Sequence, residues 1–497
     1  LNKKIENFIE DNAVVANDQI NPNEALKLLN SRIMVLPIIN HFSKIVGYYT
    51  LKDKKDLSNF KNKDVVIVGM GFVGLTLAVM LADVGMKVYG YDSSKKKIND
   101  LKKGKIPFYE KGFNKIFNFH NNKNLVFIDK LKKGIGSIYI IAVGTPLKKN
   151  SNVPNLNSIG DVSKKIGKVI KNEDLIILRS TIPIGITRNM VIPTIEKVSK
   201  LKVGKNFYIS FAPERTAEGK AIIELKQNPQ IIGGYDIKSS ELTANLFNAF
   251  THSIVNVNSI ESAEFCKLID NSYRDHRFAF INQMVELSEK LKIDLNKIVD
   301  AVNHGYSRND IPKPSPGVGG PCLTKDPYIL SSSFKKFKLD NSLLLDSRKI
   351  NKKVTNLLYK KLHIMLKKSN KDINTAKIFL VGIAFKGEPE TSDFRNSTSI
   401  DFINMFKNKK NIKIYDPVIN PKDLKELKLK FTNLKKGFKN SDVAIILNNH
   451  KSYLDIDIYS LIKSMKKPSI FIDTWHIFEP SEIKQLKGVL YGGIGVN

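Results

Sequence analysis

The sequence predicts an α/β protein in which two doubly wound parallel sheets are joined by one long central helix. Short apolar runs of strand length alternate with helical segments over residues 63–258, and the same alternation returns over residues 373–497. Between them, residues 262–291 repeat their apolar positions at helical spacing without a glycine or a proline. A chain of 497 residues is also long enough for two or three domains.

The composition indicates which kinds of molecule the chain can bind and in which compartment it works. The net charge of +32 could indicate nucleic-acid binding, but the lysines are spread along the whole chain, without zinc-finger spacing or a basic block interleaved with aromatic residues. We therefore expect an anionic small substrate and no nucleic acid. No segment approaches roughly 18 consecutive apolar residues, so we expect no membrane insertion. The two cysteines, Cys266 and Cys322, exclude a disulfide framework and suit a reducing, cytoplasmic compartment.

The first element is a short N-terminal segment, residues 1–57. A polar stretch with helical period (NPNEALKLLNSR) precedes two short apolar runs (MVLPIIN and KIVGYYTLKD), so we expect helix, strand, strand. This order resembles a single cystathionine-beta-synthase (CBS) repeat. Such repeats normally work in pairs, so the segment is either half of an adenine-nucleotide sensor or a structural remnant.

A dinucleotide-binding pattern follows. The strand KDVVIV (63–68) runs into the glycine turn GMGFVG (69–74) and a helical pattern, and the next strand, KVYGYD, ends at Asp92. The glycines let the backbone approach a pyrophosphate, while the Asp92 carboxylate can accept from both ribose hydroxyls and would repel a 2′-phosphate. The sequence thus predicts NAD rather than NADP. The predicted cofactor-binding residues here are Gly69, Gly71, Phe72, Val73, Gly74 and Asp92.

Three later apolar runs predict further strands of the same sheet, at residues 137–143, 175–180 and 207–213. The segments STIPIG, from Ser180, and PERTAEG, from Pro213, follow two of these strands, where the ligand-binding loops of α/β sheets lie. Each could also be an ordinary turn.

The long helix carries a candidate catalytic pair. Lys267 and Asn271 are four residues apart and share one helical face, where together they could hold an oxyanion. Lys267 could equally be a solvated lysine in a lysine-rich chain. Cys266, in the middle of the same helix, is interpreted as a packing residue.

Cys322 is the candidate nucleophile. It ends a glycine-rich run, KPSPGVGGPC (313–322), whose glycines let the main chain wrap closely around a ligand, and Lys325 and Asp326 follow it. A cation near a thiol favours the nucleophilic thiolate, which a small core cysteine does not need.

A lysine-rich helical stretch (334–372) then leads to the second α/β domain, with AKIFLVGIAF, NIKIYDPV, DVAIILNN and SIFIDTW as its predicted strands.

These motifs, in this order, resemble those of the UDP-glucose/GDP-mannose dehydrogenase family from about Lys63 to the C-terminal YGGIG. The matching pieces are GMGFVG with Asp92, the loop with Pro107 and Glu110, VGTP ending at Pro146, STIPIG, PERTAEG, the Lys267 and Asn271 helix, GVGGPCLTKD and FKGEPETSDFRNS. The resemblance implies an NAD-binding Rossmann domain (63–258), a central helical region with the cysteine loop that forms a homodimer (259–372), and a C-terminal Rossmann-like domain that binds a nucleotide sugar (373–497).

By this resemblance the chain is an NAD-dependent nucleotide-sugar 6-dehydrogenase. A primary alcohol that becomes a carboxylate loses four electrons, so two NAD molecules are needed for each product. Cys322 would trap the aldehyde as a thiohemiacetal, and the second oxidation would give a thioester that water hydrolyses. The other implied catalytic residues are Lys267 and Asn271 for oxyanions, Asp326 for proton transfer, and Glu218 with a water held by Thr181 as the base.

The resemblance also places residues at the two ligands. Near NAD it implies Thr145, Lys325 and Arg395. At the nucleotide sugar it implies Glu214, Arg215, Arg308, Gly317, Gly319, Gly320 and Lys386.

A few positions indicate which nucleotide sugar is the substrate. Family members that act on UDP-glucose usually carry Phe after the Pro-Glu pair, whereas this chain has Arg215, as branches acting on UDP-N-acetylhexosamines do. Those branches often have His before the cysteine and lack the lysine, so Pro321 and Lys325 depart from them. We expect a UDP-N-acetylhexosamine, with UDP-glucose and GDP-mannose as alternatives. A β-hydroxyacid dehydrogenase, which needs no cysteine, and a non-catalytic nucleotide sensor, suggested by the CBS-like start, are the alternatives from other classes.

Overall fold

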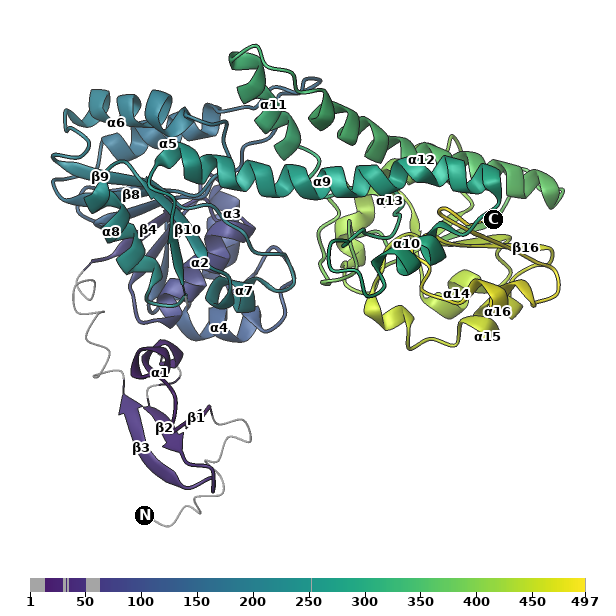
Figure 1. Cartoon of the computed structure of the whole chain (residues 1–497), viewed down its shortest axis with the longest axis horizontal. Helices are drawn as coiled ribbons and strands as arrows, with labels where there is room; N and C mark the ends of the chain where they lie inside the picture. Colours follow the sequence, from purple (N-terminus) through teal and green to yellow (C-terminus); the bar gives the residue numbers. More distant parts are fainter. Residues whose placement is uncertain (1–13, 30–32, 34, 51–62, 252, 497) are drawn as a thin grey trace. The chain divides into compact units, whose positions relative to one another are not determined.

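The structure, a computed structural model, describes residues 14–29, 33, 35–50, 63–251 and 253–496 (Figure 1). Its described parts form two compact units. The first combines residues 1–107, 111–145 and 155–267, and the second combines residues 108–110, 146–154 and 268–497. Among the described helices, none is long and apolar enough to cross a membrane.

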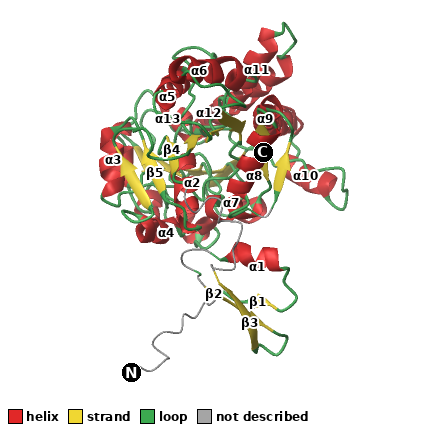
Figure 2. Ribbon diagram, turned by 90° about the vertical axis from the view of Figure 1, so that its left-hand side faces the viewer, coloured by secondary structure: helices red, strands yellow, loops and turns green. Residues whose placement is uncertain are grey.

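The N-terminal segment forms a small sheet in the order β1-β2-β3, accompanied by one helix (Figure 2). Its elements are β1 (Ala16–Asn17), α1 (Pro22–Leu28), β2 (Val35–Ile39) and β3 (Ile45–Thr50). The predicted order of helix, strand and strand is present, and a small cluster around Leu29 and Leu36 forms its core. The likeness to a CBS repeat stays a prediction, and its last residues, 51–57, lie outside the described residues.

The first unit is built on an eight-stranded sheet with the order β11-β10-β9-β8-β7-β4-β5-β6. Its strands are β4 (Val65–Val68), β5 (Val88–Tyr91), β6 (Leu125–Ile128), β7 (Ile138–Ile141), β8 (Asp174–Leu178), β9 (Phe207–Phe211), β10 (Gln230–Gly234) and β11 (Ile254–Asn256). The strand order reverses between β4 and β7, and ligands of such sheets bind at the carboxyl ends beside this switch point.

Helices cover this sheet. They are α2 (Phe72–Asp83), α3 (Lys95–Lys102), α4 (Phe113–His120), α5 (Asn157–Gly167), α6 (Ile192–Ser199) after a π-helical turn (Thr187–Val191), α7 (Ala221–Gln227) and α8 (Ile237–Phe247). Residues Gly74–Asp83 of α2 are buried, which accounts for the nearly continuous apolar sequence after the glycine turn.

The sheet is parallel as predicted except at one strand, since β10 runs antiparallel to β9. The connection uses residues 212–220 as a loop, and the helix that follows, α7, has only 7 residues. Such a helix spans about 10 Å. Helices of 5 to 7 residues also connect parallel strands in the second unit, so the direction of β10 depends on the path of residues 212–229 and not on the length of α7.

The long helix predicted at residues 262–291 is α9 (Ile260–Leu291). In the second unit it is followed by α10 (Leu295–Asn303), α11 (Asp326–Lys336) and α12 (Ser342–Lys368), and Figure 1 shows α9 and α12 side by side. The helical stretch predicted at 334–372 is thus two helices. They are separated by residues 337–341, where Lys338 has a positive φ of 58° that ends α11.

The second unit also holds a six-stranded, fully parallel sheet with the order β14-β13-β12-β15-β16-β17. Its strands are β12 (Ile378–Val381), β13 (Ile412–Tyr415), β14 (Lys430–Phe431), β15 (Val443–Ile446), β16 (Ser469–Asp473) and β17 (Val489–Gly493), and its helices are α13 (Thr398–Asn404), α14 (Leu434–Phe438), α15 (Ile458–Lys463) and α16 (Pro480–Lys484). One core packs this sheet against α9 and α12, and a second packs it against α14 and α15. The predicted second α/β domain is present.

Candidate active site

The glycine turn between β4 and α2 has the shape that a dinucleotide needs. Gly69 has a φ of +105°, which favours glycine, and a Cβ on Gly74 would lie 1.8 Å from the carbonyl oxygen of Gly69. The helix therefore starts directly against the turn, so its N-terminus lies where a pyrophosphate would bind. The residues fit a bound pyrophosphate.

Asp92 lies immediately after β5 and connects to this turn. Its carboxylate accepts hydrogen bonds from Met70 N at 3.0 Å, Ser94 N at 2.9 Å and Lys97 Nζ at 2.8 Å. Burial raises the pKa of Asp92, but these hydrogen bonds outweigh it and hold the pKa below its usual value. Asp92 is thus an anion held at the predicted ribose position, with the cation of Lys97 beside it.

The loop after β8 places Thr181 and Thr145 together. Thr145 Oγ1 donates to the carbonyl oxygen of Thr181 at 2.5 Å, and the Thr145 side chain is buried. The two predicted residues, one expected at NAD and one expected to hold water, therefore belong to one local structure at the carboxyl ends of β7 and β8.

Arg179 organises the loop after β9. Its Nη2 and Nε donate to Glu214 Oε2 at 2.6 and 3.0 Å, and its Nη1 donates to Ala212 O at 3.1 Å. Burial raises the pKa of Glu214, but Arg179 and Lys267 outweigh it, so the pKa lies below its ordinary value. The other oxygen of Glu214 accepts from the backbone N–H groups of Arg215 and Thr216, both at 2.8 Å. A contact of this carboxylate with substrate stays a prediction.

Lys267 is almost entirely buried, with 8% of its surface exposed. Its ammonium group donates to the carbonyl oxygen of Glu214, which places it at the PERTAEG loop. The alternative of a solvated lysine is therefore wrong. A buried ammonium group is a strong hydrogen-bond donor for an oxyanion.

Glu264, one helical turn before Lys267, fixes the STIPIG loop to α9. Its carboxylate accepts from Gly185 N at 2.5 Å, Thr187 N at 3.0 Å and Thr187 Oγ1 at 2.6 Å, and its side chain is fully buried. Burial raises the pKa of Glu264 to about 7, although these hydrogen bonds oppose the shift.

This raised pKa makes stability depend on pH in a defined direction. Between about pH 4.5 and pH 7 Glu264 is protonated in the folded chain and ionised in the unfolded chain, so the free energy of unfolding should fall as pH rises, by about 1.4 kcal/mol per pH unit. Glu264→Gln cannot ionise, so its melting temperature should fall less between pH 5 and pH 8. The control Glu241→Gln, at an exposed residue of α8, should keep the wild-type slope. Equal slopes for Glu264→Gln and wild type would contradict the assignment.

In the second unit, Asn271 and Asp326 form a buried pair. Asn271 Nδ2 donates to Asp326 Oδ2 at 2.5 Å, Lys325 Nζ lies 2.5 Å from Asp326 Oδ1, and both Asn271 and Asp326 are fully buried. Arg274 donates to Asn271 Oδ1, which fixes the orientation of the amide. The structure thus joins three of the predicted residues, Asn271, Lys325 and Asp326.

Cys322 is exposed and lies just before α11, and its carbonyl oxygen accepts from the backbone N–H of Asp326 at 2.9 Å. The glycine loop before it packs tightly on the segment 385–397. A Cβ on Gly320 would lie 2.6 Å from the ring of Phe385, and a Cβ on Gly319 would lie 2.6 Å from the carbonyl oxygen of Asn396. Gly317 has a φ of +111°. These positions require glycine for the fold of the loop itself.

Buried polar contacts anchor this loop from α9 and α12. Arg348 donates to Asp275 at 2.5 Å and to the carbonyl oxygen of Val318 at 3.2 Å, and Thr355 Oγ1 donates to Pro316 O at 3.1 Å. Cys322 is therefore an accessible thiol on a rigid support, as a nucleophile requires.

The remaining predicted residues are more exposed. Arg215 and Arg308 have exposed side chains, Glu218 and Lys386 are half-buried, and Arg395 donates to Asp393 at 2.8 Å. Their roles at ligands stay predictions. Cys266, interpreted as a packing residue, is only partly buried.

Comparison with known proteins supplies independent evidence. Residues 63–251 match the NAD binding domain of the UDP-glucose/GDP-mannose dehydrogenase family, residues 261–353 match its central domain, and residues 379–480 match its UDP binding domain. The UDP-N-acetyl-D-mannosamine dehydrogenase of Pyrococcus horikoshii is 30% identical over 440 residues, which cover 87% of this chain and 99% of that protein. The enzyme of that name from Campylobacter jejuni is 31% identical over 403 residues, 79% of this chain and 96% of that protein.

A solved structure of the UDP-D-ManNAc dehydrogenase from Pyrococcus horikoshii has a TM-score of 0.78 and 29% identity, over 87% of this chain and 99% of that one. The match extends along nearly the whole length of these relatives. The predicted α/β architecture, NAD dependence and dehydrogenase activity are confirmed. The chain belongs to the UDP-glucose/GDP-mannose dehydrogenase family and is an NAD-dependent nucleotide-sugar dehydrogenase.

Proposed function

We propose that the chain oxidises the C6 alcohol of a UDP-N-acetylhexosamine, with UDP-N-acetyl-D-mannosamine as the foremost candidate, to the uronic acid. The observation that carries the proposal is the exposed Cys322, on a glycine loop beside the buried Asn271 and Asp326 pair. We further propose that residues 63–258 bind NAD, residues 259–372 supply the cysteine loop, and residues 373–497 bind the nucleotide. An exposed catalytic thiol needs a reducing compartment, so we propose a cytoplasmic location.

The chemistry balances as two oxidations and one hydrolysis. One alcohol, two NAD⁺ and one water give one carboxylate, two NADH and three protons. When bound, NAD accepts the hydride that leaves C6 in each oxidation. Between the two oxidations the Cys322 sulfur adds to the aldehyde carbon, and water finally displaces the thiolate from the thioester.

The residues of the chain serve these steps as donors and bases. The buried ammonium of Lys267 and the amide of Asn271 donate to the oxyanions that form at C6. Asp326, already hydrogen-bonded to Asn271, moves the proton. Glu218, with a water on Thr181, serves as the base for hydrolysis.

The substrate assignment is tested by product analysis. The purified protein is incubated with NAD and one of UDP-N-acetyl-D-mannosamine, UDP-N-acetylglucosamine, UDP-N-acetylgalactosamine, UDP-glucose or GDP-mannose, and the acid is identified by mass spectrometry. We expect the uronic acid of an N-acetylhexosamine and two NADH for each acid. Preferred turnover of UDP-glucose or GDP-mannose would overturn the assignment, and one NADH for each product would exclude the four-electron mechanism.

The Asp92 contacts predict a change in cofactor preference. In Asp92→Ala the partner of the ribose hydroxyls is lost, so kcat/KM with NAD should fall by about 10- to 100-fold. Activity with NADP should rise, because Lys97 remains to attract the 2′-phosphate. Steady-state kinetics with both cofactors measure this. Ser94→Ala is the control, since its side chain contacts backbone and not Asp92. An unchanged ratio of NAD to NADP efficiency in Asp92→Ala would refute the role.

We also propose a homodimer formed on α9. The apolar residues Ile269, Tyr273, Phe280, Leu287 and Leu291 are 48% to 60% exposed, and their spacing places them on one face of the helix. A continuous apolar stripe of this kind marks a protein interface. Light scattering should give twice the mass of one chain. The substitution Phe280→Glu should give monomers, whereas Leu454→Glu, at an exposed leucine elsewhere, should not. A monomeric wild type would refute the dimer.

Residues 1–57 are expected to be dispensable for chemistry. Their core consists of their own residues, such as Ala25 and Leu29, and every matched motif begins at or beyond Lys63. A chain that starts at residue 58 should therefore keep kcat and KM within about twofold. Circular dichroism checks its fold. A folded truncation without activity would show that the N-terminal segment is integral to catalysis.

A further inference from the structure

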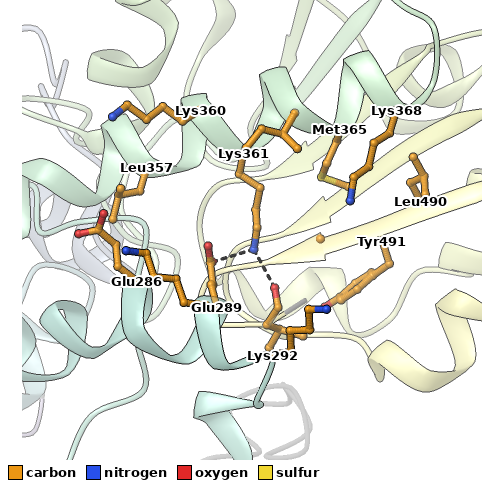
Figure 3. Close-up of a pocket in the computed structure, with 14 residues that line it drawn as sticks. Glu286, Glu289, Lys292, Leu357, Lys360, Lys361, Met365, Lys368, Leu490 and Tyr491 are labelled. Carbon is orange, nitrogen blue, oxygen red and sulfur yellow. Dashed lines mark hydrogen bonds and ion pairs between the residues drawn. The ribbon is translucent and has the colours of Figure 1, made fainter.

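The second unit contains a cavity of about 560 Å³ at the C-terminal ends of α9 and α12, next to β17 (Figure 3). Small-molecule sites typically have volumes of roughly 300–1,000 Å³. The cavity is distinct from the proposed chemistry. Asn271 precedes Glu289, in the cavity wall, by 18 residues of α9, about 27 Å along the helix axis.

Its wall carries uncompensated positive charge. Of its two acidic residues, Glu289 accepts from Lys361 at 2.7 Å, and Glu286 pairs with Lys353. Four further lysines line the cavity, and among the described residues no carboxylate forms an ion pair with any of them. These are Lys290, Lys292, Lys360 and Lys368.

Two of these lysines approach the same space. Figure 3 shows the side chains of Lys292, from the end of α9, and Lys368, from the end of α12, extending into the cavity from opposite sides. Lys361, in the same wall, is held by hydrogen bonds to Glu289 and to the carbonyl oxygens of Gly493, at 2.6 Å, and Val496, at 2.7 Å. Its position is therefore fixed by the fold.

The floor between the lysines is apolar and tightly packed. It is formed by Met365, Leu490 and Gly492, and a Cβ on Gly492 would lie 2.9 Å from the sulfur of Met365. A site with a cationic rim and an apolar floor is suited to a ligand that has both an anionic group and an organic body.

Tyr491 also lines the cavity, but its hydroxyl group has no exposed surface. The residue is 8% exposed, and its hydroxyl is buried without a hydrogen-bond partner among the described residues. Burial raises the pKa of Tyr491, so the hydroxyl stays protonated. The hydroxyl group therefore makes no contact with a ligand in the cavity, and the contribution of Tyr491 to the wall is steric.

We propose that this cavity binds a phosphorylated small molecule, with the phosphate between Lys292 and Lys368 and the organic part on Leu490 and Met365. Phosphate oxygens accept charge-assisted hydrogen bonds from ammonium groups. The site is separate from the proposed homodimer face, since Glu289 is two residues beyond Leu287 and so lies about 200° round α9 from the apolar stripe.

The first test locates binding at the lysines themselves. The full chain, saturated with NAD and UDP to fill the two nucleotide sites, is treated with a trace of acetylating reagent with and without inorganic pyrophosphate, and acetylation is measured for each lysine by mass spectrometry. At ten times the dissociation constant, acetylation of Lys292 and Lys368 should slow by about tenfold. Lys335 and Lys336, exposed at the end of α11, should react unchanged. Equal protection of both pairs, or none, would overturn the proposal.

The second test uses matched double variants. Under the same saturated conditions, the dissociation constant of pyrophosphate, measured by calorimetry, should rise by about tenfold or more in K292Q/K368Q and stay unchanged in K335Q/K336Q. All four lysines are exposed, so both variants should fold.

The same calorimetric measurement with ADP in place of pyrophosphate distinguishes the kind of ligand. Tighter binding of ADP than of pyrophosphate identifies an organic phosphate as the ligand, whereas equal binding identifies the free anion. An unchanged dissociation constant in K292Q/K368Q would overturn the site.

Discussion

Replacing Cys322 by alanine is expected to abolish formation of the acid while the protein stays folded. The thiol is exposed, and the surrounding loop is held by its glycines, by Arg348 and by Thr355. The side chain is therefore not needed for the fold. Without the sulfur no thiohemiacetal forms, so kcat for the acid should fall by at least about a thousandfold. Quantifying the acid by mass spectrometry measures this directly.

Two further variants make the Cys322 result specific. In Cys322→Ser the hydroxyl has a far higher pKa than a thiol, so capture and hydrolysis should both be slow, and a trapped ester should be detectable as an added mass. Cys266→Ala, which removes the chain's other thiol, should retain activity. Acid formation by Cys322→Ala at a rate near that of wild type would show that a hydrated aldehyde, and not a thiohemiacetal, gives up the second hydride.

The sequence predicted the parts of the fold that depend on local pattern. The strand, glycine turn and helix around Gly69 and the helix α9 follow from apolar periodicity and from glycine positions, both of which are properties of neighbouring residues. The antiparallel β10 and the break between α11 and α12 were missed. They depend on the path of a connection and on one positive φ at Lys338, which no apolar pattern encodes.

In the site, too, residues in local motifs could be predicted, whereas residues with distant partners could not. Cys322, Lys267 and Asp92 stand in recognisable motifs, so their chemistry could be inferred from spacing. Glu264 and Arg179 could not be identified, because their partners are 77 to 79 and 33 to 51 residues away along the chain. Their role is to hold loops in place through buried hydrogen bonds. The one local signal was that Glu264 precedes Lys267 by one turn on the face that carries the candidate catalytic residues.

The alternative reading of Lys267 as a solvated lysine was settled by burial rather than by sequence. In a chain with 80 lysines and arginines, the identity of one lysine carries little information. The environment of Lys267 is informative, because a lysine residue with only 8% of its surface exposed has lost most of its contact with water. A group in this state donates strongly to an oxyanion that forms next to it, since little water competes.

Replacing Lys267 by alanine is therefore expected to lower kcat by about 100- to 1,000-fold, the usual cost of losing one oxyanion donor. KM for the nucleotide sugar should change little, because the oxyanion exists only in the reacting state. The fold should weaken as well, since Lys267 helps to keep the pKa of the buried Glu214 low, so the melting temperature is measured in parallel. Lys297→Ala, at an exposed lysine of α10, controls for the loss of one positive charge. Lys267→Arg restores the charge with a larger, planar group, and it should recover stability more than kcat. If Lys267→Ala instead raised KM and left kcat unchanged, the ammonium group would be a ground-state binding group, and the oxyanion would depend on Asn271 alone.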